Sequence, residues 1–237
     1  MSGLASEVVD AAALTPADRA AMFALMELVY DGVTREAFDH DLAGKDECLV
    51  LRAESGELVG FSTQRFLTVE VDGRRVDGVF SGDTVIHPDH WGSPALLQAF
   101  TRRYFDHDPP LQWFLVSKGH RTYRMLTTFF EEFWPHRGHP TPDAARALMD
   151  AYARALYPSD YDADAGVLAY RTPKDRLREG VAGVAERDLR NPDVAFFVAR
   201  NPGHALGHDL VCLAELSPAN LKARMRGVLL GTVAAGA

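Results

Sequence analysis

The sequence predicts an α+β protein with a mixed, mainly antiparallel central sheet flanked by helices. Three observations predict this class. Helical patterns come first, and an antiparallel meander of apolar strands follows between residues 47 and 86. Two further helical patterns then flank one apolar strand at residues 111–117. Helices that alternate with an antiparallel meander in this order are typical of the α+β class.

Local signals place the elements of the first half. The first helix, from Thr15 to Tyr30, opens with Thr and Pro, which are preferred at the N-cap and the first helical position. Asp72 and Gly73 form a strong two-residue hairpin signal between two long strands. The other elements follow from apolar periodicity. The predicted helices span residues 34–42, 94–106 and 122–134, and the predicted strands span residues 47–53, 58–71, 74–86 and 111–117.

After Pro140 the pattern changes, and we expect an α/β extension that packs on the first part. Its first helix, Thr141 to Leu156, begins with a Thr cap and Pro. We therefore divide the chain into a core at residues 1–138 and an extension at residues 139–237. The extension is predicted to contain strands at residues 167–171, 194–199 and 209–215, partial helix at 176–190, and a last helix at 217–230.

Length and composition narrow the functional classes. The 237 residues fit one domain, or one domain with an added segment. A net charge of −8 gives the chain no overall attraction for nucleic acid. No apolar run approaches the ~20 residues that span a bilayer. Residues 1–10 lack a signal-peptide pattern, so a cytoplasmic location is expected. Cys48 and Cys212 fit buried thiols in a reducing compartment.

No pattern predicts a metal cofactor or a serine hydrolase. The histidine pairs lack an acidic partner at a known metal-site spacing, and the serines near strand ends have no evident His and Asp partners. The residues weighed for these chemistries are His136 with His139, His204 with His208, and Ser81 and Ser117.

The segment SGDTVIHPDHWGSPALL, residues 81–97, resembles the acyl-CoA-binding segment of the GNAT superfamily of N-acyltransferases. In that family a strand ends in a hydrophobic residue, and a Pro and a glycine-rich loop follow. Backbone amides of the loop and of the next helix N-terminus bind the pyrophosphate of coenzyme A. The resemblance covers residues 12–134 and implies a GNAT-like fold. It also implies donor-binding residues, which are Val85, Ile86, His87, Trp91, Gly92, Ser93 and Lys118.

The same segment departs from the family pattern. Trp91 stands where the family has Arg or Gln, and Pro94 and Leu96 stand near the two later glycines. Pro94 also removes one amide from the phosphate cradle. These departures imply an altered pyrophosphate site. The expected co-substrate is therefore an acyl thioester, carried either by coenzyme A or by the phosphopantetheine arm of an acyl carrier protein.

The layout also resembles a group of bacterial GNAT-like proteins. Their segments have the forms GDT-x-V/I, W-G, YWFLISKGY and NP-x-x-AFFV-x-RNP. This chain carries the corresponding residues at 82–84, 91–92, 113–120, 191–192 and 201–202. The closer resemblance implies no particular activity.

Amine acylation needs a base or a site for the ammonium, a donor to the oxyanion, and an acid for the leaving thiolate. The GNAT resemblance suggests Asp83, with its neighbour Thr84, for the amine, and the backbone amide of Val85 for the oxyanion. It suggests Tyr123 as the acid, because this residue starts the helix after the apolar strand. The alternatives are a turn or cap role for Asp83 and a buried amphipathic tyrosine for Tyr123.

Further residues have two interpretations each. Lys118 suits a phosphate or a carboxylate, or it is a solvated lysine. His120 suits a base, or it is a loop residue. His87 and His90 suit phosphate, or they cap the turn. An aromatic cluster forms either core or an acyl-chain tunnel, and it contains Phe129, Phe130, Phe133 and Trp134.

We therefore expect an N-acyltransferase that moves an acyl group from acyl-CoA or an acyl carrier protein to an amine. The acceptor is a small molecule or a peptide, and a long-chain acyl group is one option for the donor. An alternative is a non-catalytic GNAT-fold module that binds a pantetheine thioester or a protein partner. A third option is a decarboxylase or an acyl-lactone synthase on a similar fold. Neither nucleic acid nor a membrane span is expected.

Overall fold

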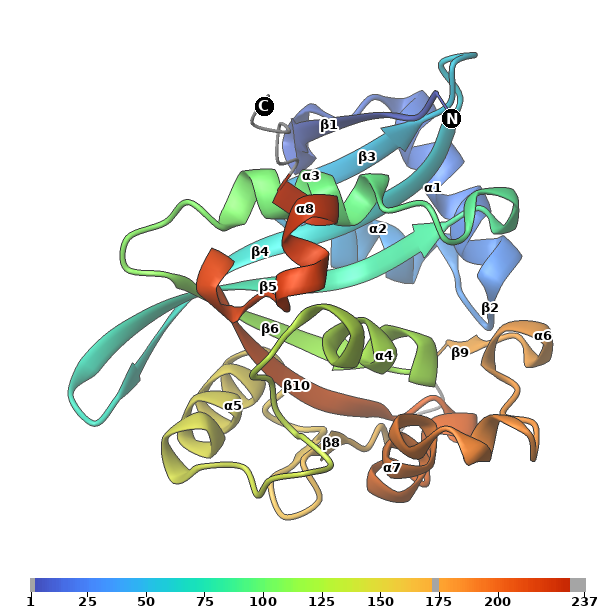
Figure 1. Ribbon diagram of the computed structural model, residues 1–237. Coiled ribbons are helices and arrows are strands. Elements are labelled where there is room, and N and C mark those ends of the chain that lie inside the picture. Colours follow the sequence, from blue (N-terminus) through green and yellow to red (C-terminus); the bar gives the residue numbers. More distant parts are fainter. Residues whose placement is uncertain (1–2, 172–174, 231–237) are drawn as a thin grey trace.

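The structure, a computed structural model, describes residues 3–171 and 175–230 (Figure 1). Within these residues, eight strands form one sheet in the order β1-β3-β4-β5-β6-β10-β8-β7. All neighbouring pairs are antiparallel except β5 and β6. The strands are β1 (Ala5–Asp10), β3 (Glu47–Arg52), β4 (Leu58–Val71), β5 (Arg74–Ile86), β6 (Leu111–Ser117), β7 (Tyr161–Asp162), β8 (Val167–Leu168) and β10 (Asp209–Leu216).

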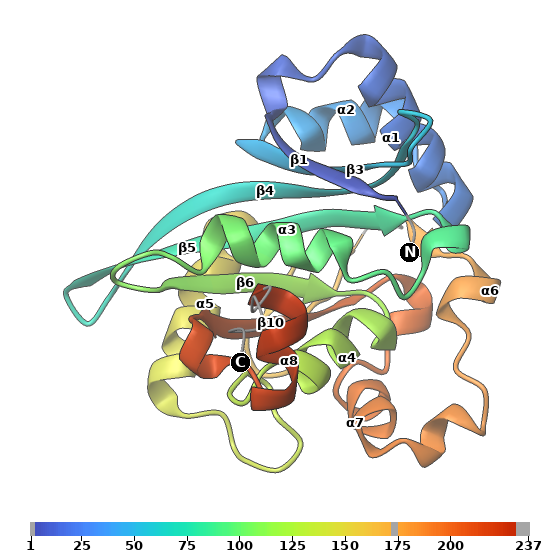
Figure 2. The same cartoon turned by 45° about the horizontal axis from the view of Figure 1, so that its top comes forward.

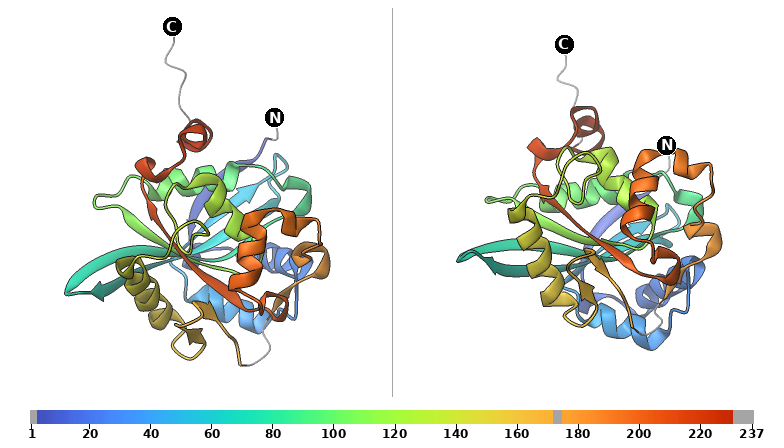
Figure 3. Two further views of the ribbon diagram at one scale, coloured as in Figure 1. Left: turned by 60° about the horizontal axis from the view of Figure 1, so that its bottom comes forward. Right: turned by 90° about the horizontal axis from the view of Figure 1, so that it is seen from below.

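Helices cover both faces of this sheet, and the figures show the two layers (Figure 3). One face carries α1 (Pro16–Val29), α2 (Arg35–Ala43) and α5 (Asp143–Leu156). The other carries α3 (Ala95–Tyr104), α4 (His120–Phe129), α7 (Pro192–Arg200) and α8 (Ala223–Leu230). The predicted α+β class, with a mainly antiparallel sheet flanked by helices, is confirmed. The remaining elements are the small pair β2 (Tyr30–Asp31) with β9 (Arg176–Leu177), and α6 (Glu179–Ala182).

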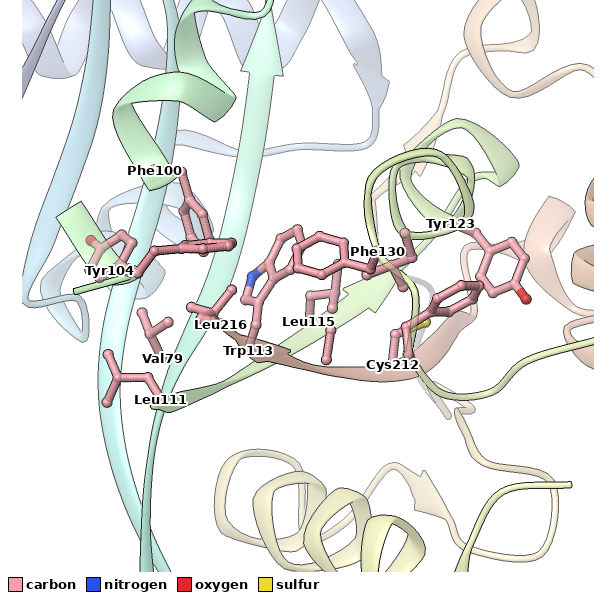
Figure 4. Close-up of a cluster of buried hydrophobic side chains, with 14 of the residues drawn as sticks. Val79, Phe100, Tyr104, Leu111, Trp113, Leu115, Tyr123, Phe130, Cys212 and Leu216 are labelled. Carbon is pink, nitrogen blue, oxygen red and sulfur yellow. The ribbon is translucent and has the colours of Figure 1, made fainter. Parts of the chain in front are cut away.

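Strand alternation builds the cores on the two faces. In β3, Leu49 packs with the α3 side, and its neighbour Val50 packs with the α1 side; both are fully buried. The α3 side holds an aromatic cluster in which Trp113 lies between Phe100 and Phe130, at ring-centroid distances of 4.9 and 5.6 Å (Figure 4). The β4–β5 hairpin extends beyond the other strands (Figure 2).

Local signals set several boundaries as predicted. The Thr15 side chain accepts from the amide of Asp18 at the start of α1, and Thr34 accepts from Ala37 at the start of α2. The hairpin turn places Asp72 at φ 52° and Gly73 at φ 72°, which a two-residue turn of this kind requires. The predicted limits of β4, β5 and β6 match the structure.

The predicted strand at residues 194–199 is wrong, because this segment forms α7. The Asn191 side chain accepts from the amides of Asp193 and Val194, and Pro192 occupies the first helical position. Val194 and Phe197, three residues apart, bury the same helical face. A short apolar run does not distinguish a strand from a buried helix, so the capping residues were the better signal.

Other boundaries shifted. Helix α5 begins after Pro142, with no side-chain cap, so the predicted Thr141 cap is absent there. Helix α4 starts at His120 and ends at Phe129. Only two residues of the strand expected at 167–171 pair as β8, and only part of the last predicted helix is α8. Strand β1 was not predicted; at a sheet edge it buries little of its surface.

The C-terminal part joins the same sheet. Strand β10 pairs antiparallel with β6 from Leu210↔Ser117 to Leu216↔Leu111. The division at residue 138 stays a prediction. Cys48 and Cys212 are buried free thiols. Among the described residues, no helix has the length and apolar character needed to cross a bilayer.

Candidate functional site

The site lies where β5 and β6 move apart. Their parallel pairing runs only from Gly78↔Gln112 to Ser81↔Leu115. Beyond it, β5 continues along β4 to Ile86, and β6 continues along β10 (Figure 1). A cavity of about 830 Å³ opens between them, lined also by residues of α1, α2, α4 and the segment 175–181. Its size is in the range of small-molecule sites.

A β-bulge in β5 lies at the start of this divergence. Gln64 pairs with Ser81 and Ser62 with Thr84, so two steps along β4 oppose three along β5. The extra residue changes the alternation of side chains. Asp83 lies within the bulge and lines the cavity. The bulge therefore explains how an acidic side chain of a central strand reaches the gap.

A close approach at Gly82 accompanies the bulge. A Cβ atom at this position would lie 2.7 Å from Thr63 Oγ1 and 2.7 Å from Lys45 Cε. The ammonium of Lys45 forms an ion pair with Asp41 and lies 5.8 Å from the centre of the Phe80 ring. Glycine at position 82 therefore leaves room for a charged side chain on the cavity wall.

A chain of hydrogen bonds holds the bulge. Trp113 Nε1 donates to Ser81 Oγ at 2.8 Å, and Ser81 Oγ donates to Gln64 Oε1 at 2.8 Å. Gln64 Nε2 then donates to Ser62 Oγ at 2.7 Å, and Ser62 and Thr84 share a hydroxyl bond of 2.7 Å. Gln64 is fully buried, so these bonds satisfy a side chain that water does not reach.

The backbone of β5 presents polar groups to the gap. The amide of His87 donates to Val59 of β4 at 2.8 Å. Because an antiparallel ladder alternates, Val85 directs its amide toward β4 as well, whereas Thr84 and Ile86 direct theirs toward the gap. Consistently, the Ile86 carbonyl faces away from β4 and accepts from Trp91 Nε1 at 2.8 Å. This geometry favours Thr84 and Ile86 over Val85 as oxyanion donors.

The loop before α3 forms the mouth of the cavity. It contains a 3-10 turn at Pro88–His90, and Gly92 adopts φ 87°. The amides of His90, Trp91 and Ser93 donate to carbonyls within the loop. The Arg121 guanidinium, from α4, stacks 4.6 Å from the centre of the half-exposed Trp91 ring. A cation from another element thus lies beside the position where the family pattern has Arg.

A buried ion network forms another part of the cavity lining. Lys118 Nζ is 3.0 Å from Asp175 Oδ2 and 3.9 Å from Asp209 Oδ2, and it donates to the Asp175 carbonyl at 3.0 Å. Tyr170 donates its hydroxyl to Asp209 at 2.6 Å. Burial lowers the pKa of Lys118, but the charges of Asp209 and Asp175 outweigh burial and raise it. The ammonium is therefore charged at neutral pH.

Asp83 belongs to the same electrostatic environment. Burial, followed by the charges of Asp83, Asp175 and Asp209, raises the pKa of Tyr30 well above its ordinary value. The pKa of Tyr157 is also raised well above its ordinary value, first by burial and then by nearby carboxylates that include Asp83. Both phenols line the cavity and keep their protons at neutral pH.

The structure brings most of the predicted site residues together. The cavity is lined by Asp83, Thr84, Val85, Ile86, Trp91, Gly92 and Lys118. His87 accepts from the amide of Asp89 at 3.3 Å, and Ser93 accepts from the amide of Ala95 at 3.3 Å, both in the loop at the mouth.

Tyr123 does not join this group. Its fully buried side chain donates to the Pro135 carbonyl at 2.9 Å and packs against Phe133 and Phe197 (Figure 4). Helix α4 begins two residues earlier than expected, at His120, and Tyr123 lies on its core face. The geometry therefore favours the alternative, a core tyrosine. The aromatic cluster at residues 129–134 likewise lies outside the cavity lining.

Sequence reasoning missed several residues of the site. Arg121, Tyr170, Asp175 and Asp209 come from separate segments, and only the fold brings them together. One sequence signal was available for Asp209, because an acidic residue rarely opens an apolar strand. In the structure this residue is buried, at 2% exposed. Within the described part of the chain, no group of three or more His, Cys, Asp or Glu residues could hold a metal ion.

The comparisons with known proteins concern the fold. No protein-family model and no curated protein matches the sequence. A probable N-acyltransferase of unknown function from Enterococcus faecalis V583 matches at 14% identity with a TM-score of 0.42, over 54% of this chain and 33% of that chain. Saccharomyces cerevisiae N-myristoyltransferase with bound myristoyl-CoA matches at 18% identity with a TM-score of 0.40, over 50% and 30%.

A GNAT family N-acetyltransferase from Escherichia coli in complex with CoA matches at 16% identity with a TM-score of 0.38, over 54% of this chain and 69% of that chain. The matched part spans about a third of the first two proteins. At these scores the likeness assigns no activity. The mixed sheet with its antiparallel meander agrees with the fold that the resemblance of residues 81–97 implies.

Proposed function

We propose that the protein is an N-acyltransferase that moves an acyl group from an acyl thioester to an amine. The observation that carries this proposal is the divergence of β5 and β6 at a bulge that holds Asp83. A gap between two strands lets an extended thioester arm lie along unpaired backbone groups. The cavity beside this gap provides space for an acceptor.

The donor fits with its phosphate at the mouth. Helix α3 begins there and directs its positive N-terminal end toward the loop, and Arg121 adds a charge beside Trp91. Several loop amides are used within the loop, which leaves a smaller cradle than a pyrophosphate requires. A single phosphate, as on the phosphopantetheine arm of an acyl carrier protein, suits this mouth, and acyl-CoA is the second donor considered.

The chemistry follows from the groups beside the gap. The amine nitrogen attacks the thioester carbonyl, so that a C–N bond forms and, on collapse of the intermediate, the C–S bond breaks. Amides of Thr84 and Ile86 stabilise the oxyanion. Asp83 takes the proton that leaves the amine. Tyr30 or Tyr157, both protonated, gives a proton to the thiolate in place of Tyr123 and regains the proton that Asp83 has taken, so that no tyrosinate remains.

The acyl group has an apolar wall available. Met26, Val29 and Phe38, from α1 and α2, line the cavity together with Leu115 and Val181. This surface supports an acyl chain longer than acetyl, because burial of each methylene stabilises the complex by about 0.8 kcal/mol.

The alternative is a non-catalytic module that binds a pantetheine thioester or a protein partner. The internally bonded loop at 88–93 favours it, because few amides are left for a phosphate. The two functions differ at Asp83. A binding module keeps its ligand when Asp83 is neutralised, whereas an enzyme keeps binding and loses turnover.

A first experiment measures the melting temperature with CoA, acetyl-CoA, a long-chain acyl-CoA and an acyl carrier protein thioester. A ligand that binds the folded state raises the melting temperature by mass action. Mass spectrometry of the same mixtures with an amine then detects the amide. A shift with amide formation that Asp83→Asn removes supports the transferase. A shift without any product supports the binding module, and no shift contradicts both.

A further inference from the structure

We propose that an acidic carrier protein delivers the acyl group and docks on the surface formed by helices α3, α4 and α8, which we call the basic face. This assignment rests on the proposed acyl transfer and names the partner that brings its donor. Three observations carry it. They are a charge asymmetry between the two sides of the sheet, exposed arginines without carboxylate partners, and the continuity of the basic face with the mouth of the cavity.

The helices on the two sides of the sheet differ in charge. The chain as a whole has a net charge of −8. Helices α1, α2 and α5, on one side, contain seven acidic residues and four arginines. Helices α3, α4 and α8, on the other side, contain six arginines and no acidic residue, and their neighbour α7 has one residue of each sign. The basic face therefore attracts negative charge although the whole chain is acidic.

Most arginines of the basic face have no carboxylate partner. Arg103 forms an ion pair with Glu47. The other five are exposed, and none of them forms an ion pair with an acidic residue within residues 3–171 and 175–230. They are Arg102, Arg121, Arg124, Arg224 and Arg226. Because a guanidinium binds a carboxylate through two parallel hydrogen bonds, these side chains suit a partner rich in Asp and Glu.

Hydrogen bonds join the three helices into one surface. Helix α8 lies between α3 and α4 (Figures 1 and 2). Gln98 of α3 donates to the Val228 carbonyl of α8 at 2.7 Å. Lys222, which directly precedes α8, donates its ammonium to the Thr127 carbonyl of α4 at 2.6 Å. The arginines of the three helices therefore belong to a single face of the molecule.

The basic face reaches the mouth of the cavity at Arg121. This side chain lines the cavity and stacks on Trp91, in the loop before α3. The other four unpaired arginines do not line the cavity. Their charges contribute to donor binding when the donor also covers the surface outside the mouth. A thioester carried by a protein meets this condition, because its arm enters the mouth while its acidic surface contacts the arginines.

The surroundings of the mouth favour a protein over other anionic partners. An anionic membrane or a nucleic acid also attracts clustered arginines, but neither brings a thioester to the cavity. Trp91 is half-exposed beside Arg121, and both residue types are enriched among the anchoring residues of protein interfaces. Acidic residues follow the helices at Asp106 and Glu131, so they mark the limits of the basic face.

The test measures binding of an acidic acyl carrier protein, loaded with an octanoyl thioester, to the full chain by fluorescence anisotropy. Arg124→Glu combined with Arg224→Glu is the variant, because neither side chain makes a hydrogen bond or ion pair within the described part of the chain. We expect about tenfold weaker binding of the carrier and a smaller loss of affinity on addition of salt. Free octanoyl-phosphopantetheine, which occupies the cavity alone, should bind both proteins equally.

Two further variants support the measurement. Arg74→Glu combined with Arg75→Glu makes the same change of charge at the exposed start of β5, after the hairpin turn, and should leave carrier binding unchanged. If the Arg-to-Glu variant of the basic face does not fold, Arg124→Gln combined with Arg224→Gln replaces it, with an expected loss of about threefold.

Equal carrier affinity of the native chain and the folded basic-face variant, or no carrier binding by the native chain, would overturn the assignment. Binding of phosphatidylglycerol vesicles or of an oligonucleotide that the variant loses, with no binding of the carrier, would also overturn it. Carrier binding that the variant loses, without amide formation from any thioester, keeps the docking surface and refutes the transferase. Amide formation from octanoyl-CoA, without carrier binding, refutes the docking surface and keeps the transferase.

Discussion

The two halves of strand β5 differ in what lies beside them. From Arg74 to Ser81 the strand has β4 on one edge, and between Gly78 and Ser81 it also has β6 on the other. From Gly82 to Ile86 it keeps β4 but loses β6. The part of β5 between β4 and β6 uses its backbone groups within the sheet, whereas residues 82–86 direct alternate groups toward a cavity. We call residues 74–81 the paired half and residues 82–86, which pair with β4 but lack β6, the unpaired half.

This difference shows how one strand combines stability with a site. The paired half packs Val79 and Phe80 in the two cores, both at most 3% exposed. The unpaired half contains the bulge, with Asp83 and Thr84 at the cavity wall. Substitutions in the two halves should therefore have different consequences, in stability for the first and in turnover for the second.

The largest expected effect is on turnover, from Asp83→Asn in the unpaired half. Loss of the proton acceptor should lower the rate of amide formation by about a hundredfold to ten-thousandfold, with little change in melting temperature. Asp77→Asn is the matched control, because Asp77 is an exposed acid in the paired half of β5 that accepts from Thr68. Equal activity of the two variants would contradict the role of Asp83.

Lys118→Met tests the ion network that closes the cavity on the side of β6. Removal of the ammonium leaves Asp175 and Asp209 without their cationic partner, and such a loss costs about 3–5 kcal/mol in unfolding free energy. Urea denaturation measures it. Arg35→Met is the control, since Arg35 and Asp39 form an exposed pair that contributes at most about 0.5 kcal/mol. A cost for Lys118→Met no larger than for the control would show that the network is not a stabilising feature.

Gly78→Ala and Gly82→Ala compare the two halves directly. At Gly78 a Cβ would lie 2.8 Å from the Gln112 carbonyl, in rigid backbone, and overpacking of this kind costs about 1–3 kcal/mol. At Gly82 one of the closest atoms belongs to the flexible Lys45, so the loss of stability should be smaller while turnover falls. Urea denaturation and initial rates give both values, and a larger stability loss at Gly82 would reverse the comparison.

The smallest effect concerns pH. The folded state lowers the pKa of His120, chiefly through burial, so protonation favours the unfolded chain. The contribution of this group is fully present above the unfolded pKa of about 6.5 and is lost as pH falls below it. The unfolding free energy should therefore decline between pH 7 and 5, and more gently in His120→Gln. An unchanged slope in that variant would assign the decline to other groups.

The elements that could be predicted from sequence are those with local causes. The limits of β4, β5 and β6 follow from apolar runs and from the Asp72-Gly73 turn, whose geometry depends on these two residues. The prediction of a strand at residues 194–199 was wrong, because this apolar run fits both a helix and a strand. Only Asn191 and Pro192, at the start of the helix, distinguish the two.

The candidate site was predictable only in part. Residues 83–92 are contiguous, and their resemblance to a known segment placed them at one end of a strand. Tyr123 was expected at the site, but the start of α4 at His120 and the packing of α7 place it in the core. Asp175 and Asp209 had no local signal that linked them to Lys118.

The sequence by itself determined strands β4, β5 and β6, the turn between β4 and β5, and the position of Asp83 near the end of β5, because propensity, alternation and turn chemistry act over a few neighbouring residues. Only the tertiary structure decided that Lys118 meets Asp175 and Asp209, that Arg121 covers Trp91, and that Asp83 faces a cavity. These contacts join residues far apart in the chain. They depend on where the sheet separates and how the C-terminal part closes against it, which no local pattern encodes.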